Sequence, residues 1–300
     1  MNVQSESRLG SLHSKPPKMP GSQNLRACDR EQDLAGKVAV VTGASRGIGF
    51  AIALHLANRG AAILTTSTGA SKHIDQLRDA ISLSFAQCES RPPKIAHQIA
   101  SLEDPNAHVK VADAVQRGFD GQTDIYINNA GISDRTFPGE LQAKTLDKIL
   151  LCNIRTPALI TDELVKRRYF RKDSRIIFIS SAQSVNCAPG VTIYAATKAA
   201  NVAMTRCYAK AFGGRSPEFD FMADTTANSV LTGLTETGGV QQYGPEEWER
   251  LQEFWVGKQL IPRLGQPDDV ADVVGLLCSK EARWITGSKI SANGGSVVVV

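Results

Sequence analysis

A tyrosine, a lysine and a serine have the types and the spacing that proton transfer to a carbonyl oxygen requires. Tyr194 and Lys198 are four residues apart in a predicted helix that runs to Phe212, so their side chains share one face. A nearby ammonium favours the phenolate, and we expect it to lower the pKa of the phenol from its ordinary value of about 10. Ser181 ends the predicted strand Arg175–Ser181, shortly before that helix. Its position argues against a pair that is merely exposed on a helix surface.

The segment TGASRGIG (42–49) forms a glycine-rich turn between the predicted strand Val38–Val41 and a predicted helix. Gly43 can adopt a turn conformation closed to other residues, and Gly47 lets a pyrophosphate approach the backbone. Gly49 lets the helix and the strand pack closely, and the first N–H groups of the helix then face the phosphates. The spacing differs from the commonest dinucleotide fingerprint, so a purely structural tight turn is the alternative. With the tyrosine–lysine pair, the turn predicts a dinucleotide beside an acid–base pair, the combination used in hydride transfer.

A second motif overlaps this turn, because residues 43–47 also match G-x-S-x-G, the nucleophile elbow of α/β-hydrolases. That fold requires an acidic residue and then a histidine late in the chain, after the nucleophile. The last histidine of this sequence is His108. Histidine placement therefore argues against a hydrolase triad built on Ser45.

The second predicted strand and the turn after it indicate which dinucleotide binds. An NAD-specific site of this kind carries an acidic residue there, which bonds the ribose 2′-hydroxyl. No Asp or Glu occurs from 61 through 74, and Arg46 of the glycine turn can pair with a 2′-phosphate. Ser67, Thr68 and Lys72 could add contacts. We therefore predict NADP(H); the alternative for Arg46 is a solvated loop charge.

The chain resembles the short-chain dehydrogenase/reductase family over about residues 35 to 296. It is most similar to NADPH-dependent 3-oxoacyl-carrier-protein reductases and fungal-type ketoreductases. Six motifs in the family's order are far more specific than any one of them. They are TGASRGIG (42–49), NNAG (128–131), Asn153 within LLCNIRTP, Ser181 with YAATK (194–198), NSVLTG (228–233), and RLGQPDDVADVV…ITG…NGG (263–295).

The resemblance implies a role for each matching residue. Tyr194 would be the general acid that protonates a carbonyl oxygen, and Ser181 would orient that oxygen. Lys198 would bind the nicotinamide ribose, and Asn153 would hold a water that links the lysine to solvent. The expected cofactor contacts are Gly43, Ser45, Arg46, Gly47, Ile48, Gly49, Ser67, Thr68, Ser101, Asn128, Asn129, Ala130, Gly131, Tyr194, Lys198 and Thr232.

The chain departs from the family pattern at two places. Ser101 stands where the family usually carries an aspartate beside the adenine, and Thr232-Gly233 stands where it carries Pro-Gly. The first change would alter an adenine contact. The second leaves the loop over the nicotinamide less rigid, because proline no longer fixes that backbone angle. Neither change removes a catalytic group.

The alternation of strand and helix patterns from Val38 onward predicts an α/β fold: a Rossmann-type doubly wound parallel sheet with helices on both faces, in a single domain spanning 34–300. Residues 1–33 are predicted to be a disordered or flexible extension. This segment faintly resembles an organellar transit peptide, but Pro16, Pro17 and Pro20 oppose the amphipathic helix that such a signal needs.

Composition excludes several other classes of protein. The net charge is +4, without a basic stripe interleaved with aromatic residues, so nucleic-acid binding is not expected. The six cysteines are scattered and form no C-x-x-C pair, which suits reduced thiols in the cytoplasm better than disulfides or a metal site. No apolar run approaches the length of a membrane helix. Cys187, before the tyrosine, could touch substrate, although a packing role is the stronger interpretation.

Two segments near the C-terminus are predicted to contact the substrate and the partner subunits. Residues 234–261 interrupt the core pattern and are expected to form a substrate lid, in which the predicted helix 246–255 carries several aromatic residues. These favour a bulky, apolar substrate, although ordinary helix packing is the alternative. The tail Val297–Val300 is expected to be buried between subunits of a homodimer or homotetramer.

Taken together, these features predict NADPH-dependent reduction of a ketone, of the 3-oxoacyl or polyketide-like class, to a secondary alcohol. One alternative is an NAD(P)-dependent alcohol dehydrogenase that works oxidatively in secondary metabolism. The other is a dinucleotide-binding protein without catalysis, which the intact Ser181–Tyr194–Lys198 set opposes. No metal is required for this chemistry.

Overall fold

The computed structural model describes residues 26–69, 72–86, 88–237 and 245–298. Among them, seven strands form one wholly parallel sheet in the order β3-β2-β1-β4-β5-β6-β7. The strands are β1 (Val38–Val41), β2 (Ala62–Ser67), β3 (Ile95–Ile99), β4 (Thr123–Asn128), β5 (Phe170–Ser181), β6 (Thr226–Thr232) and β7 (Lys289–Ala292). The helices are α1 (Gly47–Asn58), α2 (Lys72–Phe85), α3 (Ala107–Phe119), α4 (Ala143–Leu150), α5 (Thr156–Lys166), α6 (Thr192–Phe212), α7 (Pro245–Val256) and α8 (Pro267–Cys278).

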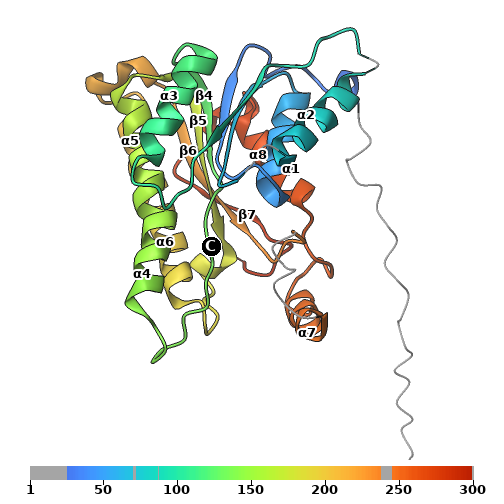
Figure 1. Ribbon diagram of the computed structural model, residues 1–300, viewed down its shortest axis with the longest axis vertical. Helices are drawn as coiled ribbons and strands as arrows, with labels where there is room; N and C mark the ends of the chain where they lie inside the picture. Colours follow the sequence, from blue (N-terminus) through green and yellow to red (C-terminus); the bar gives the residue numbers. More distant parts are fainter. Residues whose placement is uncertain (1–25, 70–71, 87, 238–244, 299–300) are drawn as a thin grey trace, which may run out of the picture.

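Helices cover both faces of the sheet, with α1, α2 and α8 on one side and α3, α5 and α6 on the other (Figure 1). Each face has its own apolar core, because successive side chains of a strand point to opposite faces. In β1, Ala39 and Val41 pack toward α1 and α8, whereas Val38 and Val40 pack toward α3 and α5. The predicted doubly wound single-domain fold is therefore confirmed.

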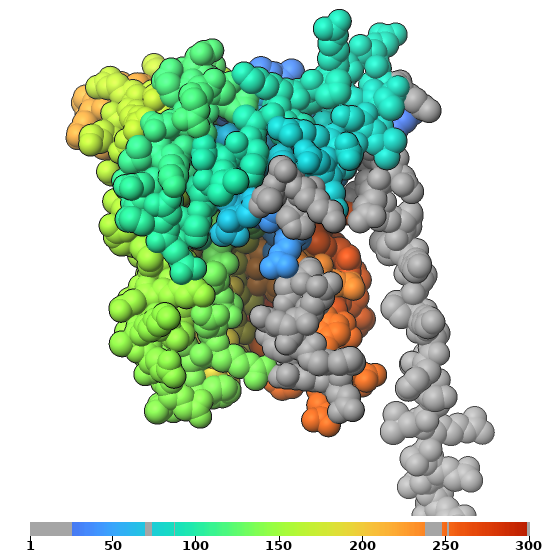
Figure 2. Space-filling model, viewed as in Figure 1, coloured from blue at the N-terminus to red at the C-terminus, as the bar shows by residue number. Residues whose placement is uncertain are grey.

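The strand order reverses beside β1, since β2 lies on one side of it and β4 on the other. In a sheet of this kind, a crevice opens at the carboxyl ends of the two strands where the chain turns to opposite faces. The glycine-rich turn follows β1 at this point. Figure 2 shows this face of the molecule hollowed between the green segment that includes α4 and the orange segment near the C-terminus.

The structure packs residues 26–33 onto the domain, although the sequence assigned them to a flexible extension. Ala27 is fully buried, and Gln32 Nε2 donates hydrogen bonds to the carbonyls of Ala27 (3.0 Å) and Asn58 (2.8 Å). Asp33 forms an ion pair with Arg59. These anchors are single residues without apolar periodicity, which is why composition did not reveal them. Residues 1–25 lie outside the described part of the chain.

Several element boundaries differ from those predicted. The strand expected from Arg175 begins at Phe170, and α6 begins at Thr192. The predicted lid helix 246–255 is α7, which Figure 1 shows apart from both helix layers. All six cysteines are free thiols, but the fold brings Cys28 against Cys88, with the Cys28 N–H 3.1 Å from the Cys88 Sγ. Within the described residues, no helix is both long and apolar enough to cross a membrane.

Candidate active site

The carboxyl end of β5 and the start of α6 bring together the tyrosine, serine and lysine that the sequence singled out. Ser180 Oγ donates a hydrogen bond to the Lys198 carbonyl (2.9 Å), and Lys198 Nζ donates one to the Ile179 carbonyl (2.7 Å), so the strand fixes the helix. Lys198 Nζ lies 5.6 Å from the centre of the Tyr194 ring. The Ser181 hydroxyl lies near the Tyr194 phenol and acts to lower its pKa. Ser181 at the end of β5 and Lys198, one helical turn after Tyr194, therefore both lie close to the Tyr194 side chain.

The electrostatics of this cluster differ from the prediction. Burial raises the pKa of Tyr194, and the hydrogen bond to Ser181 only partly opposes that effect. Burial also lowers the pKa of Lys198 to about 8. The prediction that Lys198 lowers the tyrosine pKa is wrong for the protein's own groups, because loss of hydration disfavours both charged forms. At neutral pH the phenol is protonated and ready to donate.

Asn153 lies in a π-helical turn, Leu151–Arg155, that joins α4 to α5. Its side chain is buried and forms three hydrogen bonds: Oδ1 accepts from the Ile132 N–H (2.9 Å), and Nδ2 donates to the Ile132 carbonyl (2.9 Å) and to Thr197 Oγ1 (3.1 Å). The asparagine therefore ties the segment after β4 to the helix that carries Tyr194. π-Turns of this kind occur frequently at functional sites. Its expected water-holding role stays a prediction.

A cavity of about 340 Å³ lies beside this cluster and collects most of the expected cofactor contacts. Gly131 lies where the cavity borders this cluster, since a Cβ added to it would lie 3.1 Å from Asn153 Oδ1 and 3.5 Å from Lys198 Nζ. The expected residues that line the cavity are Gly43, Ser45, Arg46, Gly47, Ile48, Gly49, Ser67, Thr68, Ser101, Asn129, Ala130 and Gly131. Residues that the sequence did not indicate also line it: Thr66, Ala100, Leu102, Glu103, Ile132, Cys152 and Thr237.

Four of the sixteen expected contacts are not part of this lining: Tyr194 and Lys198, which belong to the cluster described above, and Asn128 and Thr232. Asn128 is the last residue of β4 and is buried within the sheet. Thr232 pairs with Ser181 in the β5–β6 register and donates a hydrogen bond to the Ser180 carbonyl (3.1 Å). It therefore stands next to the catalytic cluster instead. The side chain of Lys72, another expected contact, lies outside the described residues.

The glycine turn has the geometry that a pyrophosphate needs. Gly43 and Gly47 have φ angles of 67° and 58°, in the left-handed region that favours glycine. A Cβ at Gly49 would lie 2.5 Å from Asn129 Nδ2. That amide nitrogen already donates to the carbonyls of Thr42 (2.9 Å) and Gly43 (3.1 Å), so it holds the turn in place.

The start of α1 can also accept a phosphate. The helix has neither a side-chain cap at Arg46 nor an acidic residue in its first turn. Its first N–H groups thus remain available to an anion at the end of the cavity. Arg46 itself is exposed and lines the same cavity. The described residues therefore fit a dinucleotide with a further phosphate.

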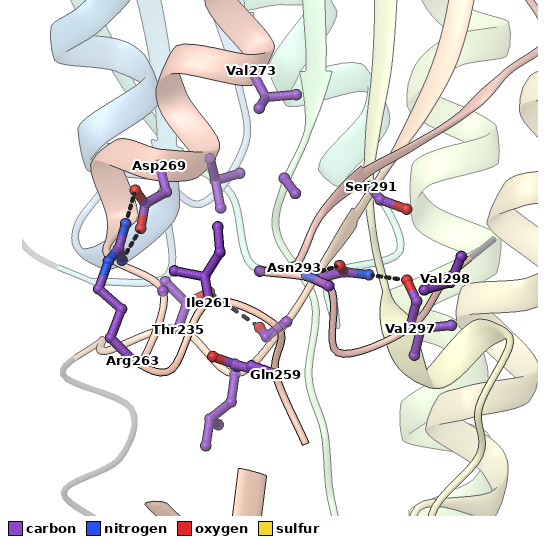
Figure 3. Close-up of a pocket in the computed structure, with 17 residues that line it drawn as sticks. Thr235, Gln259, Ile261, Arg263, Asp269, Val273, Ser291, Asn293, Val297 and Val298 are labelled. Atoms are coloured by element: carbon purple, nitrogen blue, oxygen red, sulfur yellow. Dashed lines mark hydrogen bonds and ion pairs between the residues drawn. The ribbon is translucent and has the colours of Figure 1, made fainter. Parts of the chain in front are cut away.

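A second cavity, of about 500 Å³, lies between the start of α8, the end of β7 and the C-terminal segment (Figure 3). Arg263 and Asp269 close one side with two hydrogen bonds of 2.6 and 2.7 Å. On the other side, Asn293 Nδ2 donates to the Val297 carbonyl (3.2 Å) and fixes the start of the valine tail. Val298 is 73% exposed in the single chain. Val299 and Val300 lie outside the described residues.

Comparisons with known proteins agree with this fold. Residues 43–296 match a family model described as enoyl-(acyl carrier protein) reductase. The short-chain dehydrogenase/reductase FrzI of Cladobotryum sp is 33% identical over 89% of this chain and 98% of its own length. The 3-oxoacyl-[acyl-carrier-protein] reductase FabG of Thermotoga maritima is 28% identical over 88% of this chain and 99% of its own.

The solved structure of the angucycline C-6 ketoreductase LanV with bound NADP is similar to this one, with a TM-score of 0.76 and 28% identity. It covers 89% of this chain and 98% of the LanV chain. The chain therefore belongs to the short-chain dehydrogenase/reductase family, a family of oxidoreductases that act on carbonyl and hydroxyl groups.

Proposed function

We propose that this protein uses NADPH to reduce a ketone to a secondary alcohol, and that the ketone is bulky and apolar, of the 3-oxoacyl or polyketide-like class. The observation that carries the proposal is the meeting of Tyr194, Ser181 and Lys198 beside the cavity of the glycine turn, with Gly131 between them. This arrangement offers a proton donor, an oxygen-binding hydroxyl and a cation at one end of a dinucleotide-sized site.

In this proposal Tyr194 donates its proton to the carbonyl oxygen, which Ser181 holds by a hydrogen bond. A bound nicotinamide would supply the hydride. Burial suits the tyrosine to this direction of reaction, since a raised pKa keeps the phenol protonated at neutral pH. Lys198 would hydrogen-bond the ribose, and its hydrogen bond to the Ile179 carbonyl (2.7 Å) holds the ammonium in place. Much of the rate would come from holding these groups in one arrangement.

The preference for NADPH rests on the end of the cavity formed by the glycine turn and β2. Arg46, Ser67 and Thr68 line it, and no acidic residue occurs in β2 or in the turn that follows. A 2′-phosphate placed there would meet a guanidinium and hydroxyl donors. The NADP-bound relative LanV supports the same choice.

The proposed substrate class rests on exposed apolar side chains near the tyrosine. Phe137 and Val185 are 41% and 44% exposed. The loop of Phe137 is tied to the start of α6, because Thr136 N–H donates to the Gly190 carbonyl (2.7 Å) and Thr136 Oγ1 accepts from the Ile193 N–H (3.2 Å). The apolar surface therefore borders the helix turn that carries Tyr194.

The lid helix α7 adds further aromatic surface. Phe254 is 53% exposed and packs edge-on against Trp255, with the Lys258 ammonium 3.8 Å from the Phe254 ring centre. Exposed aromatic rings offer a large apolar surface to a ligand. These rings favour a ketone of several carbon or ring units over a small polar one.

The proposal is tested by following cofactor absorbance with NADPH and a panel of carbonyl compounds. The panel contains a 3-oxoacyl thioester, an aromatic polyketide-like ketone, a short polar ketone and a 2-enoyl thioester. The enoyl thioester is included because the matching family model is described as an enoyl-(acyl carrier protein) reductase. We expect oxidation of NADPH with the first two and little with the polar ketone. Turnover confined to the enoyl thioester, or to NADP⁺ with an alcohol, would contradict the proposed reaction.

We also propose that the protein assembles as a homodimer or homotetramer through the β7 side of the sheet. β7 is an edge strand of the sheet. Leu276 of α8 is 57% exposed, Trp284 95% and Val298 73%. Large apolar side chains beside an open strand edge are typical of surfaces that associate.

A further inference from the structure

His97 of β3 stands directly behind the end of the cavity that the proposed function assigns to the adenosine ribose. Its Nε2 lies 3.2 Å from Ser67 Oγ, and its Nδ1 lies 3.0 Å from Thr65 Oγ1. Ser67 ends β2 and lines the cavity together with Thr68 and Arg46. A titratable ring therefore contacts, from behind, a hydroxyl that faces the ligand site.

The hydrogen bonds define which ring nitrogen carries a proton. Ser67 Oγ donates its single proton to the Gly69 carbonyl (3.0 Å), so the contact with His97 requires Nε2–H to donate to the serine oxygen. In the neutral ring, Nδ1 then accepts from the Thr65 hydroxyl. This hydrogen-bond network therefore assigns the neutral His97 ring to the tautomer with its proton on Nε2.

The same network also accommodates the protonated ring. When Nδ1 gains a proton, it donates to Thr65 Oγ1, and the threonine proton can turn to the Ala96 carbonyl, 3.5 Å away. Nε2–H continues to donate to Ser67 Oγ. Both charge states of His97 therefore keep their partners, and no buried donor is left unpaired when the ring titrates.

Burial and a nearby positive charge both favour the neutral form of the His97 ring. Partial burial lowers the pKa of His97, a hydrogen bond with the Thr65 backbone opposes this, and Arg78 of α2 lowers the pKa further. Arg78 is itself paired with Asp75 (3.2 Å), and Arg46 lies at the same end of the cavity. A dianionic phosphate at Ser67 would reverse this balance, since a nearby negative charge stabilises an imidazolium.

We propose that His97 is a positioning residue for cofactor choice: it holds Ser67 toward a ribose 2′-phosphate and takes up a proton when that phosphate binds, which strengthens the preference for NADP(H) over NAD(H). The proposal rests on the proposed function, because it needs a phosphorylated ribose at the Ser67 end of the cavity. The Ser67 hydroxyl then turns from the Gly69 carbonyl to the phosphate while His97 retains the serine oxygen.

The test compares wild-type protein with His97→Gln by titration calorimetry with NADPH and with NADH. Each titration is run near pH 6.5 in two buffers of different ionisation heat, which gives the protons exchanged per cofactor bound. Glutamine can still donate to Ser67 but cannot titrate. His108→Gln, on α3 and away from the cavity, is the matched control, and Ser67→Ala serves as a second variant should His97→Gln fold poorly.

With NADPH, we expect wild type and His108→Gln to take up more protons than His97→Gln, by a fraction approaching about one proton. With NADH the three proteins should agree. The ratio of NADH to NADPH dissociation constants should fall by roughly threefold to tenfold in His97→Gln at this pH. A free phosphate monoester, with a second pKa of about 6, is already mostly dianionic near pH 6.5, so it releases few protons on binding.

Equal proton counts in wild type and His97→Gln, with an unchanged affinity ratio, would overturn the role of His97 while leaving NADPH-dependent reduction intact. Failure of wild type to bind NADPH at all would overturn both. A loss of affinity for NADPH and NADH alike, without a difference in proton count, would mean a purely structural role and would also refute the proposal.

Discussion

Replacing Lys198 by methionine should change how the free energy of unfolding responds to pH. Burial lowers the pKa of Lys198 from 10.5 to about 8, a difference of about 2.5 pH units (10.5 − 8) that corresponds to about 3 kcal/mol. Below about pH 8 the lysine is charged in both states, so the folded protein bears the full cost of the buried charge. Between about pH 8 and 10.5 the unfolded chain binds more protons than the folded one, so stability rises with pH. The methionine variant has no such proton.

Urea unfolding of both proteins at several pH values from about 7.5 to 10.5 measures this effect. We expect wild type to gain about 3 kcal/mol relative to Lys198→Met across that range, because all other titrations are common to the two proteins. Lys210→Met removes an exposed lysine from the same helix and should cause no comparable change. A stability difference between wild type and Lys198→Met that is constant with pH would refute a buried, destabilised ammonium.

Three further variants test the cavity and the tail. Gly49→Ala should lose about 1–3 kcal/mol of stability and most cofactor affinity, because its Cβ would lie 2.5 Å from Asn129 Nδ2. Gly118→Ala, whose Cβ would make only an ordinary contact at 3.5 Å, is the control. Equal unfolding midpoints for the two variants would contradict the predicted overlap. Arg46→Ala should raise the Kd for NADPH by roughly tenfold and leave that for NADH nearly unchanged; equal effects on both cofactors would show that Arg46 does not read the phosphate. Truncation after Gly295 should lower the oligomeric state in sedimentation, and an unchanged oligomer would count against the valine tail as an interface.

Local motifs with a physical rationale allowed the fold and most of the site to be predicted. The glycine turn, the strand end at Ser181 and the helical spacing of Tyr194 and Lys198 each depend on residues close in sequence, and the parallel sheet then brings the strand ends to one edge. Twelve of the expected cofactor residues line one cavity for this reason.

Features that depend on distant parts of the chain could not be predicted in the same way. Glu103 and Thr237 reach the cavity from loops without a recognisable pattern. Asn153, in the π-helical turn, forms hydrogen bonds with Ile132, twenty-one residues earlier, and no spacing rule anticipates that pair. The tyrosine pKa was mispredicted because burial, which only the folded structure reveals, is the largest influence on it and raises it.

The central claim is that Tyr194 supplies the proton to the substrate oxygen, and a Tyr194→Phe variant tests it most directly. Tyr208→Phe, which removes another hydroxyl from the same helix, is the matched control. Single-turnover rates with saturating NADPH and a ketone from the panel should fall about 10²- to 10⁴-fold in Tyr194→Phe, with the Kd for NADPH changed little. Tyr208→Phe should stay close to wild type. A Tyr194→Phe rate equal to that of wild type would contradict the account.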